Sequence, residues 1–370
     1  MSVPFSRRLD WSLTVNRLSD ALTRHRPRLD LTASNPTRAG LHYPPELLTA
    51  FQHPEALLYE PDPRGAAAAR EALGLGPHTL LSASTSEAYA WLFKLLCDPG
   101  DEILVPRPSY PLFEFLARLE SVEVRQYSLR YAEGWWLDFD SLEHLLTPRT
   151  RAILFVHPNN PTGSYLKHPE LERLSTICRS RGIALISDEV FAEYAFTDDA
   201  SRCPTLGGNE ECLTFVLGGL SKTAGMPQMK VAWLTASGPG AGQAAQRLEL
   251  IADTYLSVST PVQHALPALL RHGAAVREQI LARTRANLRT LQRSSLRPLH
   301  VEGGWYAVIP TPRSRPEEEW ALYLLEHEQT LTQPGYFYDF ESDGLLVLSL
   351  LTPEADFASG VQAIERVFTV

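Results

Sequence analysis

The chain has 370 residues, of which 44% are hydrophobic and 21% are charged, and its formal net charge is -9 at pH 7. This length and composition fit one large hydrophobic core plus a smaller one, and they exclude a largely disordered chain. The acidic balance, the lack of a basic block interleaved with aromatic residues, and the shortness of every apolar run argue against nucleic acid and membrane as partners.

Residues 1–44 are expected to form an N-terminal segment that packs with a small C-terminal domain. They contain one predicted helix, residues 13–23, followed by an arginine-rich step into a loop punctuated by proline.

Residues 45–262 are expected to form a large domain, because short apolar runs alternate there with helical periodicity. This pattern predicts an α/β fold with a mainly parallel seven-stranded sheet between helices. The predicted strands are residues 80–82, 103–105, 122–127, 152–156, 183–186, 214–217 and 231–235, and a helix is expected over 89–97.

Residues 263–370 are expected to form a smaller α+β domain. The predicted helices are residues 263–271, 275–293, 316–328 and 353–368, and the predicted strands are residues 305–309 and 345–350.

The cysteines show no C-x-x-C spacing, and three of the four lie in or beside apolar runs. They are Cys97, Cys178, Cys203 and Cys212. We therefore expect buried thiols in a reducing cytoplasm rather than disulfides or zinc ligands, and we assign no metal site. The N-terminus also lacks the apolar core of a signal peptide.

Polar residues follow several predicted strands, where open α/β sheets bind their ligands. The run from Ser82 to Ala88 leads into a helix, so its hydroxyls either cap that helix or cradle a phosphate. The cluster at Asn159 and Asn160 has the composition of a turn. Asp188 ends an apolar strand, where it either caps the next element or faces a protonated ring nitrogen.

A lysine is displayed after another predicted strand, residues 214–217. Gly218 and Gly219 interrupt the apolar run just before Lys222, and this arrangement holds an amine at the rim of a parallel sheet. Most lysines are only solvated surface charges, but an amine at such a rim can form a Schiff base with a carbonyl.

Four motifs in this order closely resemble the class I/II aminotransferases, the fold-type I enzymes that depend on pyridoxal 5′-phosphate (PLP). They are D-P-G-D-E-I-L-V-P-R-P-S-Y ending at Tyr110, P-N-N-P-T-G around Asn160, D-E-V-F from Asp188, and L-S-K-T-A-G around Lys222. The resemblance covers nearly the whole chain. It implies the PLP-dependent transferase fold and PLP as the cofactor.

The resemblance also implies a role for each matched residue. Lys222 would carry the Schiff base and move a proton at the substrate α-carbon, Asp188 would pair with the pyridinium nitrogen, and Asn160 would bind the ring 3′-oxygen. The other cofactor-binding residues would be Tyr110 on the ring face, Thr85 and Ser86 in the phosphate loop, Lys230 where the family usually has an arginine, and Tyr59, which reaches the phosphate of the partner subunit. A homodimer with shared active sites is therefore implied.

Some positions depart from the family pattern. Phe191 stands where many members have a tyrosine, Gly219 stands where a serine is common, and Lys230 offers a point charge instead of the fork of an arginine. Val347 stands where members that bind α-amino acids carry an arginine for the α-carboxylate. Arg38 is a candidate replacement, although it also fits a solvated loop arginine.

The first prediction is an aminotransferase that moves an amino group between a small-molecule amine and a keto acid. The alternative is a PLP-dependent lyase, decarboxylase or cyclase of the same fold, whose substrate is not held by the usual arginine. A PLP-binding protein without turnover is a third reading. The retained Lys222, Asp188 and Asn160 favour an enzyme, because buried charges without a task are costly.

Overall fold

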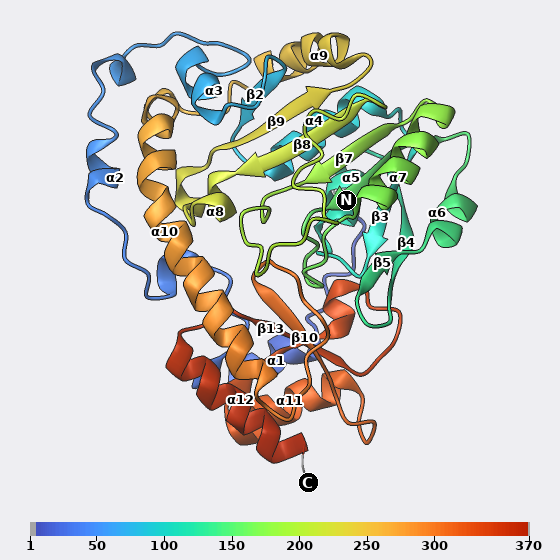
Figure 1. The fold of residues 1–370 in the computed structure, drawn as a ribbon, viewed down its shortest axis with the longest axis vertical. Coiled ribbons are helices and arrows are strands. Elements are labelled where there is room, and N and C mark those ends of the chain that lie inside the picture. Colours follow the sequence, from blue (N-terminus) through green and yellow to red (C-terminus); the bar gives the residue numbers. More distant parts are fainter. Residues whose placement is uncertain (1–4, 369–370) are drawn as a thin grey trace, which may run out of the picture.

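An eight-stranded sheet forms the centre of the larger lobe in the computed structural model, which describes residues 5–368 (Figure 1). The strand order is β2-β9-β8-β7-β6-β3-β4-β5, and only β9 and β5 run against the others. The strands are β2 (Thr79–Ser82), β3 (Glu102–Arg107), β4 (Glu123–Tyr131), β5 (Trp135–Leu137), β6 (Thr150–Val156), β7 (Ala184–Asp188), β8 (Thr214–Gly219) and β9 (Ala232–Ser237).

The predicted mainly parallel sheet is confirmed, but the predicted number of strands is wrong by one. All seven predicted runs form strands, and β5 adds an eighth at the edge by folding back on β4. A strand of three residues in a hairpin is too short to give a periodic signal, so the sequence pattern misses it.

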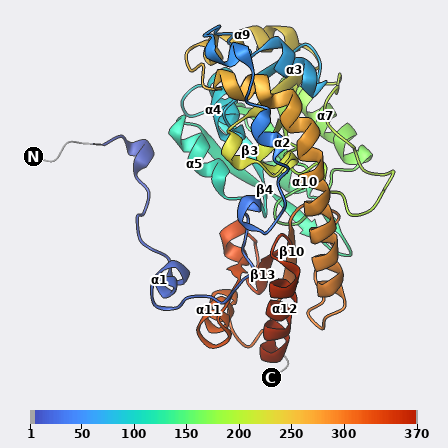
Figure 2. The same ribbon diagram turned by 90° about the vertical axis from the view of Figure 1, so that its left-hand side faces the viewer.

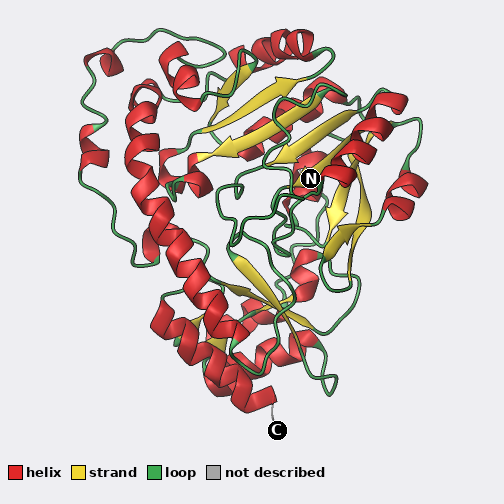
Figure 3. Ribbon diagram, viewed as in Figure 1, coloured by secondary structure: helices red, strands yellow, loops and turns green. Residues whose placement is uncertain are grey.

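Helices cover both faces of this sheet (Figure 3). Successive residues of a strand point to opposite faces, so Leu154 packs in the core with α4 and α9, whereas its neighbours Ile153 and Phe155 pack in the core with α7. Burial on both faces explains why the strands read as continuous apolar runs. The helices of this lobe are α2 (Glu46–Thr49), α3 (Ala67–Leu73), α4 (Thr85–Leu96), α5 (Leu112–Leu119), α6 (Phe139–Leu145), α7 (His168–Arg181), α8 (Leu220–Thr223) and α9 (Ala241–Asp253).

The smaller lobe is built around an antiparallel sheet of order β10-β13-β12. Leu18, Ala21 and Leu31 from the N-terminal segment share its core, and β1 pairs with β11. The boundaries at residues 44 and 262 remain a prediction. The elements are α1 (Arg17–Arg24), β1 (Leu29–Asp30), β10 (Tyr306–Pro310), α11 (Glu317–Glu328), β11 (Thr330–Leu331), β12 (Gln333–Pro334), β13 (Leu345–Ser349) and α12 (Glu354–Phe368).

One long helix, α10 (Thr260–Gln292), runs from the larger lobe to the smaller one (Figure 1). The sequence predicted two helices with a break at residues 272–274, and this was wrong. Gly273 lies inside the continuous helix because a Cβ there would meet the Ala224 Cβ at 2.6 Å and the Met226 Cε at 2.8 Å. The glycine therefore allows α10 to pack closely on the loop that follows Lys222.

Residues 5–16, before α1, form an arm on the outside of the molecule (Figure 2). The arm contacts α5, because the Arg8 side chain donates a hydrogen bond to the Leu119 carbonyl at 3.0 Å and the Trp11 ring lies 5.1 Å from the Phe115 ring, centroid to centroid. The arm includes the start of the helix predicted over 13–23, which instead begins at Arg17, where the Asn16 side chain accepts a hydrogen bond from the Ser19 amide. The side chains of Phe5 and Leu13 are 85% and 89% exposed. No helix among residues 5–368 is long and apolar enough to cross a bilayer.

Candidate active site

The register of the large sheet brings the ends of several strands to one edge. Ser82 at the end of β2 and Gly219 at the end of β8 both pair with Ala232, the first residue of β9. Asp188 at the end of β7 pairs with Val156 at the end of β6. The residues that directly follow these strands therefore gather along this edge, as expected for a ligand site of an open α/β sheet.

Most of the predicted site residues follow strands at this edge. Lys222 is in α8 after β8, Asp188 ends β7, Asn160 follows β6, Thr85 and Ser86 open α4 after β2, Lys230 precedes β9, and Tyr110 follows β3. Tyr59 differs from these, because it lies in the loop before α3 and its side chain is 77% exposed.

Both glycines before Lys222 are required by close packing against β9. A Cβ at Gly218 would lie 2.4 Å from the Trp233 Nε1, and a Cβ at Gly219 would lie 3.1 Å from the Ala232 Cβ. The second contact gives a physical reason for the departure at position 219, since a serine there would push on the neighbouring strand. The glycines thus let the end of β8 pack closely against β9 just before Lys222.

The amine of Lys222 lies against aromatic rings. Its Nζ is 4.9 Å from the ring centroid of Trp305 and 5.6 Å from that of Phe191. The side chain as a whole keeps some exposure, but burial of the amine lowers the pKa of Lys222 to about 8, against the opposing effect of the Asp188 charge. A larger fraction of the amine is therefore neutral and nucleophilic near neutral pH than for an exposed lysine.

Asp188 is buried and held by two hydrogen bonds. The Tyr89 hydroxyl donates to its Oδ2 at 2.7 Å, and the Val190 amide donates to its Oδ1 at 3.1 Å. Burial raises the pKa of Asp188, whereas the Tyr89 hydrogen bond lowers it. A cation placed opposite this carboxylate would favour the ionised form further.

Tyr89 was not singled out from the sequence. It lies in α4 four residues after Thr85, a spacing that places both residues on one face of the helix. That spacing is the signal that could have identified Tyr89 as part of the site.

Asn160 is also buried, and its Oδ1 has no hydrogen-bond partner among the described residues. The neighbouring Asn159 is engaged differently, since its Oδ1 accepts a hydrogen bond from the Thr162 hydroxyl at 3.0 Å. A buried polar atom without a partner is costly. The Asn160 Oδ1 is therefore suited to accept a hydrogen bond from an O–H or N–H group of a ligand at this edge.

The start of α4 combines a cap with free hydroxyl groups. Ser84 caps the helix by accepting from the Glu87 amide at 3.1 Å, and the Glu87 carboxylate accepts from the Ala83 amide at 2.7 Å. Thr85 and Ser86 are partly exposed in the first turn, and neither hydroxyl bonds another residue of the described chain. The capping role thus belongs to Ser84, and the next two residues remain available to an anion.

Val347 lies on β13 and has no exposed surface. It pairs with Val308 and Gln333 on the neighbouring strands and belongs to the same apolar cluster as Phe191 and Trp305. The small sheet therefore contributes an apolar, uncharged side chain to this cluster, which we call the apolar wall.

Arg38 ends a short 3-10 helix, Pro36–Arg38, and its side chain is exposed. It forms no ion pair within residues 5–368. The next residue, Ala39, is buried in the cluster that contains Val347 and Trp305. The loop thus carries a free guanidinium next to the apolar wall.

Known aminotransferases are similar to this chain in sequence. A family model described as "Aminotransferase class I and II" matches residues 68–356. The chain is 30% identical over 257 residues to the glutamate-pyruvate aminotransferase AlaA of Escherichia coli K12, a match that covers 65% of this chain and 63% of that protein. The alanine aminotransferase of Mycobacterium tuberculosis H37Rv is 27% identical over 300 residues, covering 76% of this chain and 68% of that protein.

The fold resembles that of solved aminotransferases over its whole length. An aminotransferase from Escherichia coli superimposes with a TM-score of 0.86 at 23% identity, covering 100% of this chain and 99% of that one. At this identity the likeness concerns the fold alone. In sequence, the chain spans 63% of the length of AlaA, somewhat less than two thirds.

Proposed function

The chain belongs to the class I and II aminotransferases, and we propose that it transfers an amino group between a small-molecule amine and a keto acid, with PLP bound at Lys222. The observation that carries this proposal is the meeting of Lys222, Asp188 and Asn160 at one edge of the large sheet. An amine of lowered pKa, a buried carboxylate and an unpaired amide atom form a donor and acceptor set for a pyridine aldehyde.

The residues present fit PLP. The orphaned amide oxygen of Asn160 supplies a partner for a ring hydroxyl. The hydroxyls of Thr85 and Ser86 at the start of α4, together with Lys230 from the loop before β9, would supply partners for a phosphate. When bound, PLP supplies a carbonyl that condenses with amines and a ring that accepts electrons from the substrate α-carbon.

Each residue then has a separate task. The neutral amine of Lys222 takes and returns a proton at the substrate α-carbon. Asp188, kept ionised in part by the Tyr89 hydroxyl, holds a positive charge on the ring nitrogen. Trp305 and Phe191 keep water away from the amine by packing against it.

The test is to mix the PLP-loaded protein with a panel of amino donors and record its visible spectrum. Amino transfer predicts conversion to a stable amine form of the cofactor and return to the starting spectrum when a keto acid is added. The Lys222→Ala protein is the control and should do neither at a comparable rate. The panel includes donors with an α-carboxylate and donors without one. If the protein binds PLP without turnover, none of these donors converts the cofactor.

A second reaction class is favoured by one observation, the apolar wall at Val347. A substrate that is not held by a carboxylate handle suits a lyase, a decarboxylase or a cyclase of the same fold. Release of ammonia or carbon dioxide from a donor, without accumulation of the amine form of the cofactor, would favour this class over amino transfer.

We also propose a homodimer with shared active sites. The Tyr59 side chain is exposed, so it is not part of a buried site in its own chain. Leu57, two residues before it, is 92% exposed. Exposed apolar residues of this kind mark protein interfaces. Mixing Lys222→Ala with Tyr59→Phe subunits at limiting PLP should recover activity, because one site of each mixed dimer is intact. No recovery despite verified subunit exchange would contradict a shared site.

The cytoplasmic location also remains our proposal. Its support is that Cys97, Cys178, Cys203 and Cys212 are all free thiols in the structure. Cell fractionation with an antibody to the protein tests it.

A further inference from the structure

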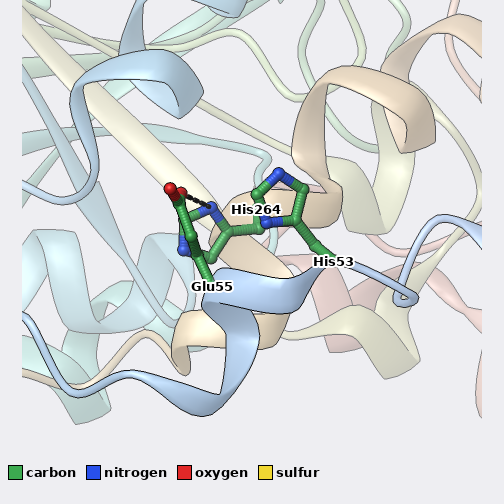
Figure 4. A group of neighbouring side chains, drawn as sticks. All are labelled: His53, Glu55 and His264. Carbon is green, nitrogen blue, oxygen red and sulfur yellow. Dashed lines mark ion pairs between the residues drawn. The ribbon is translucent and has the colours of Figure 1, made fainter.

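Two histidines and a glutamate meet on the surface of the larger lobe, away from the motifs of the cofactor site (Figure 4). His53 precedes a short 3-10 helix, Pro54–Leu57, that contains Glu55, and His264 lies near the start of α10. One ligand atom from each residue lies within 4.8 Å of those of the other two. The three residues come from segments far apart in the sequence, so only the fold brings them together.

The cluster is close to the dimensions of a zinc site. Tetrahedral zinc with bonds of about 2.0 to 2.2 Å holds neighbouring ligand atoms roughly 3.4 Å apart. The His264 Nδ1 lies 3.9 Å from the Glu55 Oε2, so small side-chain movements bring both to this spacing. Two histidines and one glutamate form a ligand set that zinc uses in proteins, whereas calcium and magnesium prefer oxygen alone.

One ring must turn before both histidines bind the same ion. The two imidazole rings are stacked, with centroids 4.6 Å apart and planes 3° from parallel, and parallel planes do not share a metal. His53 and Glu55 are exposed, so they can change rotamer at little cost. His264 is partly buried and provides the more fixed ligand.

Apart from the stacking of the two imidazole rings, these side chains make few interactions. Within residues 5–368, neither imidazole nor the Glu55 carboxylate has another hydrogen-bond or ion-pair partner. The contact between Glu55 and His264 is long and exposed, and such ion pairs contribute little to stability. The polar atoms of all three residues are therefore free to bind an ion.

We propose that His53, Glu55 and His264 bind one Zn²⁺ ion, with water in the fourth position. The ion would join the 3-10 helix to α10. A hydrogen bond already connects α10 to the start of α3, because the Gln263 Oε1 accepts from the Ala66 amide at 2.6 Å. Zinc would thus hold one end of the segment 53–66 and this hydrogen bond the other, and the exposed Tyr59 lies between them.

Zinc binding to chelator-treated protein, measured by calorimetry and by competition with a coloured zinc indicator, tests the site. The expected result is one zinc ion per chain, with affinity lowered at least about tenfold in His53→Ala, Glu55→Gln and His264→Ala. His272→Ala, two turns further along the same helix, is the matched control and should bind zinc as the wild type does. Equal binding by the wild type and His264→Ala, or an equal loss in His272→Ala, would overturn the proposal.

Hydrogen exchange provides a second readout that does not depend on activity. Zinc should slow amide exchange in residues 53–66 of the wild type and have no such effect on His264→Ala. Circular dichroism first establishes that each variant is folded. Tight zinc binding with unchanged exchange in this segment would contradict the joining of the two elements.

Discussion

The two walls of the candidate site are built from different sheets and carry different chemistry. The edge of the large sheet presents Lys222 and a buried Asp188, both with shifted pKa values. The small sheet contributes Val347, which is buried in one apolar cluster with Trp305. Residues 316–365 contain no lysine or arginine. The comparison teaches that the polar groups at the edge of the large sheet and the apolar cluster at the small sheet come from separate elements, so one can change in sequence while the other is retained.

The largest expected effect concerns the amine of the large-sheet wall. Lys222→Ala should lower turnover by about 10² to 10⁴, because general acid and base catalysis contributes this much, while the protein still binds PLP. Steady-state kinetics measure the loss. Borohydride reduction of the wild type should label the peptide that contains Lys222, and Lys230→Ala is the control. Labelling at Lys230 instead would overturn the assignment.

The next prediction concerns the apolar wall. A bidentate arginine-carboxylate pair contributes about 1.5 to 3 kcal/mol, so alanine or aspartate should bind at least about tenfold to a hundredfold more weakly than they would if the arginine were present. If Arg38 replaces the missing handle, Arg38→Ala should raise the KM of carboxylate substrates and Arg26→Ala should not. Saturation by alanine at micromolar levels, unchanged in Arg38→Ala, would contradict this interpretation.

Val347→Arg is a poor way to restore the handle. Val347 has no exposed surface, so the introduced charge would be buried in an apolar cluster.

A smaller effect is expected from Tyr89, which we assign as a positioning residue. Its hydroxyl lowers the pKa of Asp188, so Tyr89→Phe should raise that pKa and move the acid limb of the pH-rate profile to higher pH. The activity lost at acidic pH should be severalfold. Tyr127→Phe is the matched control, because Tyr127 also donates a buried hydrogen bond, at 2.8 Å to the Leu154 carbonyl, away from Asp188. Equal pH profiles for both variants would remove the positioning role.

The smallest expected effect is spectroscopic. Phe191 is buried with its ring 5.2 Å from that of Trp305, centroid to centroid, so no phenol donates toward the cofactor from this position. A phenol there would stabilise the anionic 3′-oxygen and lower the pKa of the lysine-cofactor link. Phe191→Tyr should therefore lower the midpoint of the visible pH titration by up to about one unit. A raised or unchanged midpoint would reject this argument.

Local sequence patterns were sufficient for most of the fold. Each strand of the large sheet except β5 was predicted because burial on both faces makes its run apolar. The short β5 and the continuity of α10 were missed, because a three-residue hairpin strand has no period and because Gly273 suggests a helix break. Tertiary packing keeps the helix whole.

The sequence by itself determined which residues lie at the edge of the large sheet. Lys222, Asp188 and Asn160 each follow a strand within a few residues, and parallel strands bring such positions together. The tertiary structure alone decided the pairings between distant segments: the hydroxyl of Tyr89 on Asp188, the ring of Trp305 against the amine of Lys222, and the cluster of His53, Glu55 and His264. The physical reason is that a strand-end motif is local, whereas a contact between side chains of separate elements depends on how those elements pack.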